Sequence, residues 1–170
     1  VKSIIKITIF SIMPIIYSRY DKELNLKTYI EENNDAIDRI VDTTDREYDL
    51  GIVVDCASKD RIGQNNDLFS KCRNTICVDH HVSNTNYCDI NYVEGEVSSC
   101  CQVIYSLFKD LGVTFSREIG ESLVSGILTD TNGFGNNNVD KNTFNIVSEI
   151  MDLGVNVHEI YKKLCLSIIL

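Results

Sequence analysis

The triplet Asp79-His80-His81 contains the residues of this chain that are best suited to chemistry. It follows the apolar run 75–78, which has the length and composition of a buried strand. A carboxylate and two imidazoles released together where a strand ends place metal ligands and a phosphate-binding group within one side chain's reach. Two of the three histidines in the sequence lie here. The triplet therefore predicts a site for a metal ion, a phosphate group or both.

Two aspartates stand in similar places further along the chain. Asp55 ends the apolar run 50–54, and Asp130 follows the run 126–129 and precedes a polar loop that contains glycine. In parallel sheets the functional residues collect at the carboxyl ends of the strands. We therefore expect Asp55 and the triplet to reach the same edge of a sheet.

Together these residues form a mixed set of oxygen and nitrogen ligands. Asp55, His80 and Asp130 suit manganese or magnesium better than zinc, because none of them is a thiolate. His81 would then serve to hydrogen-bond a phosphate oxygen or to donate a proton to a leaving group, while Asp79 orients an imidazole. The competing interpretation is that an aspartate at a strand end only forms a turn. A purely structural role explains the two adjacent histidines less well than it explains the aspartates.

The elements that must position these residues alternate along the chain. At 170 residues, 44% of them hydrophobic, the chain fits one domain with a real core. Alternation over residues 5–9 indicates a strand. Continuous apolar strands separated by helices imply an α/β fold with a mostly parallel, doubly wound, Rossmann-like sheet that has helices on both faces.

Apolar spacing and capping residues predict four helices. They cover 98–111, 117–128, about 140–153, and a segment that begins at Asn156. Ser116 is the expected cap of the second helix, and Gly112 and Gly154 are the expected stops after the first and the third. His158 falls on the last helix, where we expect a solvated side chain.

The composition excludes several classes of protein. A net charge of -9 argues against broad attraction to nucleic acid such as duplex DNA, so a nucleotide substrate would need cations as mediators. Seven cysteines without a CxxC pair indicate a reduced cytoplasmic protein without structural zinc. The apolar stretch 1–17 is interrupted by Lys2, Lys6 and Pro14, which fits neither a membrane span nor a signal peptide.

Three separate motifs resemble those of one family, the DHH phosphoesterases. Residues 76–84 look like the family signature, residues 53–58 with 61–63 resemble its second motif, and residues 126–134 resemble its fourth. Order and spacing also agree, so the similarity covers roughly residues 48–164.

Two short segments narrow the resemblance. Asn91-Tyr92-Val93-Glu94 and Ser98-Ser99 look most like the nanoRNase group, which comprises bifunctional oligoribonucleases and 3'-phosphoadenosine-phosphate phosphatases. This likeness implies a short oligonucleotide or a nucleotide as substrate. Cyclic-di-AMP phosphodiesterases resemble these segments almost as well. Family II inorganic pyrophosphatases share the triplet, but their pattern fits Ser83-Asn84 less well.

The resemblance implies a two-metal hydrolase that usually depends on Mn2+, with Mg2+ as the alternative. Asp55 would bridge the ions, and His80 and Asp130 would complete the protein ligands of the second metal. His81 would contact the scissile phosphate, and we assign Asn84 with it to substrate binding. Two cations a few ångströms apart would stabilise both the entering and the leaving oxygen.

One part of the family pattern is missing. Its first motif, a histidine followed by Asp-x-Asp, has no counterpart, and residues 1–54 contain no histidine. We therefore expect a chain truncated at both ends. Residues 1–154 would form a DHH domain that lacks its first strand-helix unit, and residues 155–170 would begin a linker helix towards an absent domain.

An incomplete domain changes the expected behaviour. One partial metal site would remain, with weak or no activity in this chain alone. Exposed strand flanks would favour oligomerisation. The alternative to an enzyme is a non-catalytic nucleotide-binding or scaffold protein with a degenerate metal site.

Overall fold

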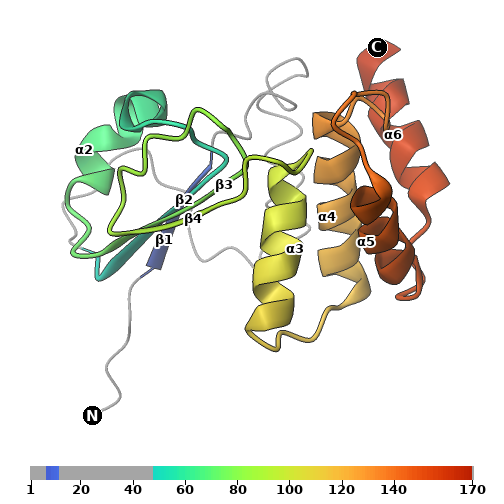
Figure 1. The fold of residues 1–170 in the computed structure, drawn as a ribbon, viewed down its shortest axis with the longest axis horizontal. Coiled ribbons are helices and arrows are strands. Elements are labelled where there is room, and N and C mark those ends of the chain that lie inside the picture. Colours follow the sequence, from blue (N-terminus) through green and yellow to red (C-terminus); the bar gives the residue numbers. More distant parts are fainter. Residues whose placement is uncertain (1–6, 12–47, 170) are drawn as a thin grey trace. The chain divides into compact units, whose positions relative to one another are not determined.

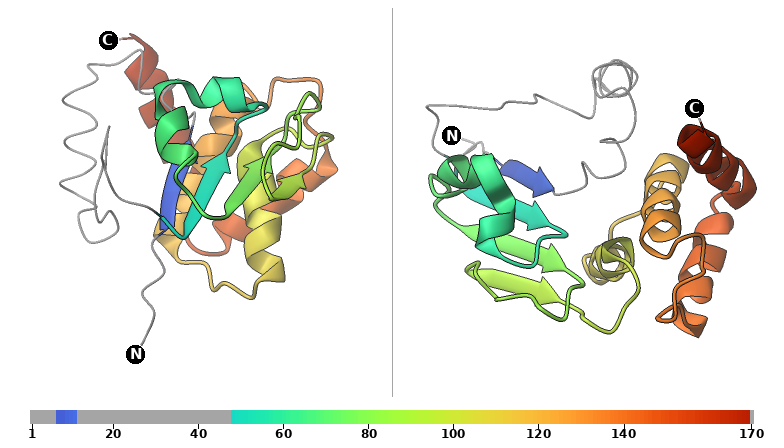
Figure 2. Two further views of the ribbon diagram at one scale, coloured as in Figure 1. Left: turned by 90° about the vertical axis from the view of Figure 1, so that its left-hand side faces the viewer. Right: turned by 90° about the horizontal axis from the view of Figure 1, so that it is seen from above.

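The computed structural model describes residues 7–11 and 48–169, and its strands form one sheet. The order across the sheet is β1 (Ile7–Ser11), β2 (Leu50–Val54), β3 (Thr75–Asp79) and β4 (Ile90–Val93). β1 pairs with β2 in parallel, and the arrows of all four strands point the same way in Figure 2. The expected α/β fold with a mostly parallel sheet is confirmed. The strand expected at residues 5–9 is described from Ile7 onward.

The chain forms two compact units. The first unit comprises residues 1–77 and 85–91, and the second comprises residues 78–84 and 92–170. In the first unit, β2 alternates between buried and half-buried side chains, and η2 (Lys59–Asn65) and α2 (Asn66–Phe69) follow it along the chain. The buried core of this unit contains Tyr48, Val53, Cys56, Ile62, Leu68, Phe69 and Cys77.

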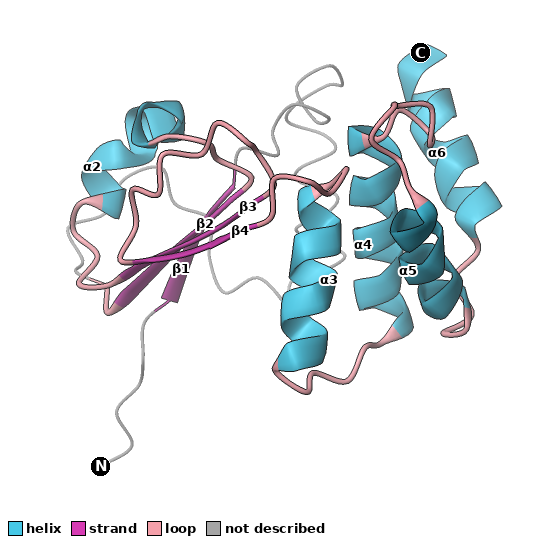
Figure 3. Ribbon diagram, viewed as in Figure 1, coloured by secondary structure: helices cyan, strands magenta, loops and turns pink. Residues whose placement is uncertain are grey.

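The second unit contains the longer helices of the described chain, α3 (Cys100–Asp110), α4 (Arg117–Asp130), α5 (Lys141–Met151) and α6 (Val157–Ile169) (Figures 1 and 3). All four predicted helices are confirmed, and α4 ends two residues later than expected. Their apolar faces share one core, whose completely buried members are Val124, Ile127 and Ile150. Among the described residues, no helix combines the length and apolarity needed to cross a membrane.

The ends of these helices follow the predicted capping residues. The Ser116 hydroxyl accepts a hydrogen bond from the third residue of α4. Asp140 and Thr143 form a reciprocal capping box at the start of α5, and the Thr143 N–H bond lowers the pKa of the Asp140 carboxyl. Gly112 and Gly154 adopt left-handed φ angles of 68° and 83°, which suit glycine at a helix end.

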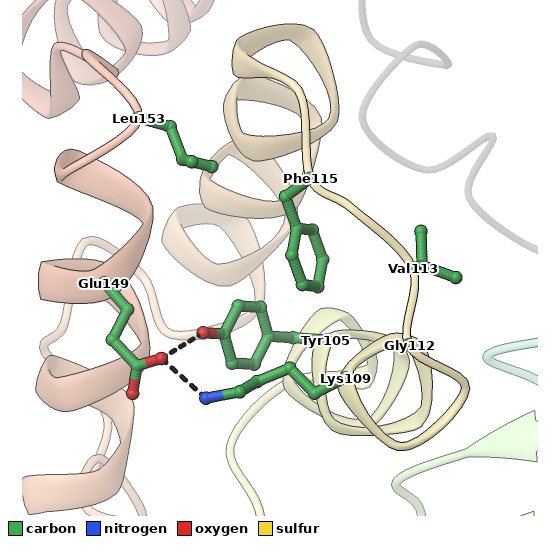
Figure 4. A pocket seen from close by; sticks show the side chains of 7 residues that line it. All are labelled: Tyr105, Lys109, Gly112, Val113, Phe115, Glu149 and Leu153. Carbon is green, nitrogen blue, oxygen red and sulfur yellow. Dashed lines mark hydrogen bonds and ion pairs between the residues drawn. The ribbon is translucent and has the colours of Figure 1, made fainter.

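An exposed charged cluster joins α3 to α5 (Figure 4). The Tyr105 hydroxyl and the Lys109 ammonium both donate to Glu149 Oε2, at 2.6 and 2.7 Å. The Lys109 and Tyr105 bonds, in that order of size, lower the pKa of the Glu149 carboxyl. These three residues line a pocket of about 390 Å³ together with Gly112, Val113, Phe115 and Leu153.

The cysteines of the chain are free thiols. Cys56, Cys77, Cys100 and Cys101 are buried and fill the core as small apolar side chains do. Burial raises the pKa of the Cys72 thiol, which keeps it protonated.

Candidate metal and phosphate site

Asp55 stands directly after β2 in the first unit, as the sequence predicts. Its φ of 58° is left-handed, and the next residue, Cys56, is completely buried. Aspartate tolerates this conformation better than most residues because its short polar side chain bonds locally. The left-handed residue therefore ends the strand and turns the chain at the position of the proposed ligand. Hydrophobic periodicity gives no signal for this turn.

Asp79 remains inside β3 as its last residue, whereas the sequence suggested that it would be released with the histidines. Its side chain is completely buried, and its carbonyl accepts a hydrogen bond from Glu94 N–H at 3.0 Å, which extends the strand by one residue. Oδ1 lies 2.7 Å from His81 Nδ1, and Oδ2 accepts from Asn84 Nδ2 at 2.6 Å. A buried carboxylate requires such donors. Asp79 thus fixes the side chains of His81 and Asn84.

The two histidines present the same ring nitrogen for chemistry. His80 Nδ1 lies 3.2 Å from the carbonyl oxygen of Val97, and because a carbonyl only accepts, Nδ1 carries the proton. In the same way, the Asp79 carboxylate only accepts, so His81 Nδ1 carries a proton and donates a hydrogen bond to it. Each neutral ring is therefore left with its lone pair on Nε2, the nitrogen that a metal or a proton would use. The ring centroids lie 4.8 Å apart at 61°.

Asp130 is the last residue of α4, although the sequence placed it two residues beyond the end of that helix. Its Oδ2 accepts a hydrogen bond at 3.3 Å from the backbone N–H of Cys100, the first residue of α3. A carboxylate is favourable there because the first N–H groups of a helix have no partner within the helix. The Asp130 backbone carbonyl also accepts from Asn136 Nδ2 at 2.8 Å.

The donor chemistry of these residues fits a divalent metal ion. Asp55 belongs to the first unit and His80 and His81 to the second, and each offers a carboxylate oxygen or an imidazole nitrogen that a metal can bind. Carboxylate and imidazole donors without a thiolate suit Mn2+ or Mg2+. The sequence assigned Asp55 and His80 to the metal as well, with Asp130 as the third ligand and His81 on the phosphate.

Sequence reasoning assigned no structural role to a set of buried polar residues, although it used Ser98 for the family resemblance. Ser98, Gln102 and Thr143 are buried with exposed fractions of 2%, 1% and 0%. They hydrogen-bond to one another in the second unit. The polar character of Gln102, beside the apolar positions of α3, was the one available signal, and it does not reveal the partner 41 residues away.

Comparison with known proteins identifies the family. Residues 7–127 match the N-terminal domain of the DHH family. A probable bifunctional oligoribonuclease and PAP phosphatase of Streptococcus mutans is 30% identical over 132 residues, which are 76% of this chain and 42% of that protein. An uncharacterized protein of Mycoplasma genitalium is 25% identical over 118 residues, 69% of this chain and 36% of its own length. The crystal structure of an exopolyphosphatase-related protein from Bacteroides fragilis matches 87% of this chain and 39% of that chain, with a TM-score of 0.65 and 26% identity.

The family match covers more than half of the chain, so the chain belongs to the DHH family. The resemblance inferred from the motifs is confirmed. The match includes Asp55 and the triplet and ends three residues before Asp130, whose assignment therefore rests on the fourth motif. The chain spans 36% and 42% of the lengths of the two relatives named above.

Proposed function

We propose that this chain carries the metal centre of a phosphoesterase that hydrolyses phosphodiester or phosphomonoester bonds of short oligonucleotides or nucleotides. One observation carries the proposal. Within the segment that matches the DHH family, His80 and His81 follow β3 with Nδ1 of each ring held by an acceptor. Oriented in this way, His80 offers its Nε2 lone pair to a metal ion, and His81 in its doubly protonated form offers an Nε2–H to a phosphate oxygen.

Asp55, His80 and Asp130 are the proposed ligands, with Asp55 as the bridge in a two-metal site. Their carboxylate and imidazole donors support Mn2+, with Mg2+ as the alternative. Bound ions would supply positive charge to the phosphate oxygens and lower the pKa of a coordinated water.

The remaining polar groups are proposed to act on the substrate. In its doubly protonated form, His81 would donate an Nε2–H hydrogen bond to the scissile phosphate or a proton to the leaving oxygen. The buried Asp79 carboxylate supports this role, because it holds His81 Nδ1 and leaves rotation of the ring little freedom. Asn84, held by the other oxygen of Asp79, would bind the substrate beside His81.

A second candidate function is that of a nucleotide-binding protein without catalysis and with a degenerate metal site. The negative net charge would again require cations between protein and phosphate. Both candidate proteins would bind the metal ion, but only the enzyme would hydrolyse a substrate.

Hydrolysis of an RNA dinucleotide and of bis-p-nitrophenyl phosphate in the presence of Mn2+ tests the proposal. We expect His80→Ala to lower turnover by about 100-fold, since a ligand to the metal is lost. His158→Ala is the matched control, because His158 is an exposed histidine on α6 and its loss should leave turnover unchanged. Mn2+ binding without any turnover in the unmodified chain would contradict the enzyme and support the non-catalytic protein.

A further inference from the structure

A short segment of the second unit contacts two of the proposed metal ligands through its backbone. At one end of the segment 97–100, the carbonyl of Val97 accepts a hydrogen bond from His80 Nδ1 at 3.2 Å. At the other end, the N–H of Cys100 donates to Asp130 Oδ2 at 3.3 Å. A shift of this segment would therefore change the orientation of both side chains at once.

The side chain between these two backbone groups anchors the segment. Ser98 is 2% exposed, and its hydroxyl donates to Gln102 Oε1 at 2.5 Å. Gln102 is itself 1% exposed and lies in the first turn of α3. Ser98 thus ties the segment to a buried amide, and its oxygen also lies 3.2 Å from Thr143 Oγ1, the acceptor of the same amide.

The other end of the amide is also held. Gln102 Nε2 donates to Thr143 Oγ1 at 3.2 Å, and the Thr143 hydroxyl donates in turn to the Asp140 carboxylate at 3.1 Å. Each hydroxyl has one proton, so Thr143 accepts from the amide and Ser98 donates to it. The chain of donors runs in one direction from Ser98 to Asp140, and this direction fixes which way the Gln102 amide points.

Helix capping alone does not account for this arrangement. Ser99 is the N-cap of α3, and Gln102 stands three residues later, the spacing of a capping box. In that motif the glutamine would accept from the N-cap backbone N–H, whereas here its oxygen accepts from Ser98. Gln102 also sits between the buried residues Cys101 and Val103, where an apolar side chain would pack without needing partners.

We propose that Gln102 is a positioning residue for the metal centre. Through Ser98 it holds the Val97 carbonyl against His80 Nδ1 and the Cys100 N–H against Asp130. This role rests on the proposed function, because it requires His80 and Asp130 to be ligands of the metal. Its immediate effect, the Nδ1-protonated form of His80, exists without a metal and can be measured separately.

Imidazole nitrogen NMR of the metal-free 170-residue chain tests this effect at a pH where the rings are neutral. The His80 signals are identified by their loss in His80→Gln. We expect the Nδ1-protonated form to predominate in the unmodified chain, and the other tautomer to increase several-fold in Gln102→Leu. Tyr105→Phe is the matched control, since it removes a different hydrogen bond from α3 to α5 and touches neither end of the segment.

The same variants are then titrated with Mn2+ by calorimetry. We expect Gln102→Leu to weaken Mn2+ binding about tenfold, because the hydrogen bonds that orient the metal ligands are lost. Tyr105→Phe should weaken Mn2+ binding less than about twofold. A change of tautomer in Gln102→Leu without Mn2+ binding in any variant would overturn the proposed metal centre and support the positioning of His80.

Two outcomes would overturn the positioning role. One is an unchanged His80 tautomer in Gln102→Leu, and the other is an equal change in Tyr105→Phe, which would assign the effect to lost stability. If Gln102→Leu does not fold, Ser98→Ala cuts the same link with a smaller change in volume. It should alter the tautomer in the same way, and an unaltered His80 in a folded Ser98→Ala chain would also overturn the proposal.

Discussion

The helices α3 and α5 are joined by two polar links that differ in their surroundings. The first joins Gln102 to Thr143, both at most 1% exposed and both uncharged. The second joins the buried Tyr105 and the exposed Lys109 to Glu149, and the side chains of Lys109 and Glu149, which carry its charges, are 50% and 52% exposed. Gln102 and Tyr105 lie three residues apart on α3, so the two links share one face of that helix.

The difference determines what each link can do. Groups of a broken buried link find no water, so the full cost of desolvation remains. Groups of a broken exposed link are solvated again, which leaves little net effect. The buried link can therefore hold a backbone segment in one position, whereas the exposed link contributes a modest amount of stability that depends on pH.

The first way to sharpen this comparison is to destabilise the second unit without touching either link. A Cβ on Gly126 of α4 would lie 2.1 Å from Cys101 Sγ on α3. We expect Gly126→Ala to lower the free energy of unfolding by about 3 kcal/mol, the upper end for overpacking, in urea denaturation. The His80 tautomer should remain that of the unmodified chain. Partial recovery of stability in Gly126→Ala combined with Cys101→Ala is the control, and a loss below ~1 kcal/mol would contradict the close approach of the helices.

Breaking the buried link should have the next largest effect. Gln102→Leu removes the amide acceptor of the Ser98 hydroxyl and the amide donor to Thr143, and leaves the two hydroxyls, 3.2 Å apart, with each other. We expect a loss of about 2 kcal/mol in the free energy of unfolding, measured with urea. Unchanged or increased stability would mean that apolar packing replaces the link, as it does for some buried polar groups.

The sequence predicted most of the elements because their signals are local. Ser116 and Gly112 mark helix ends by their own side chain or backbone preference, and both predictions are confirmed. The strand before the histidines followed from its apolar run, and the family followed from motifs that are continuous in sequence. Information of this kind needs no knowledge of the tertiary structure.

The parts that the sequence did not predict depend on contacts between distant segments. The pairing of Glu94 with Asp79 keeps that carboxylate in the strand, and nothing in the run 75–78 indicates it. Gln102 meets its partner Thr143 through the packing of α3 against α5, which no local sequence pattern encodes. The left-handed φ of Asp55 is likewise a property of a turn that periodicity does not encode.

The exposed link can be broken at its neutral donor. Tyr105→Phe removes the hydroxyl bond to Glu149 and keeps the ring, which lies 5.4 Å from Lys109 Nζ and stacks on Phe115 with centroids 5.0 Å apart. We expect a loss of about 1 kcal/mol in the free energy of unfolding by urea, half of that for the buried link. A loss equal to that of Gln102→Leu would contradict the distinction between the two links.

The smallest expected effect is the pH dependence of the exposed link. The folded-state pKa of Glu149 lies below its usual value of 4.5, first because of the bond from the Lys109 ammonium and then because of the Tyr105 hydroxyl. A carboxyl whose pKa is lowered by folding contributes stability above its unfolded-state pKa, and this contribution is lost as the pH falls through the folded-state value. We therefore expect the Tm of the unmodified chain to exceed that of Glu149→Gln by about 1 °C at pH 7, with the difference shrinking as the pH falls below 4.5. Gln102→Leu should show no such change of its Tm deficit over this range, because its link carries no charge. A Tm difference between the unmodified chain and Glu149→Gln that grows as the pH falls would have the opposite sign. It would exclude ionised Glu149 as the source of the pH dependence of the exposed link.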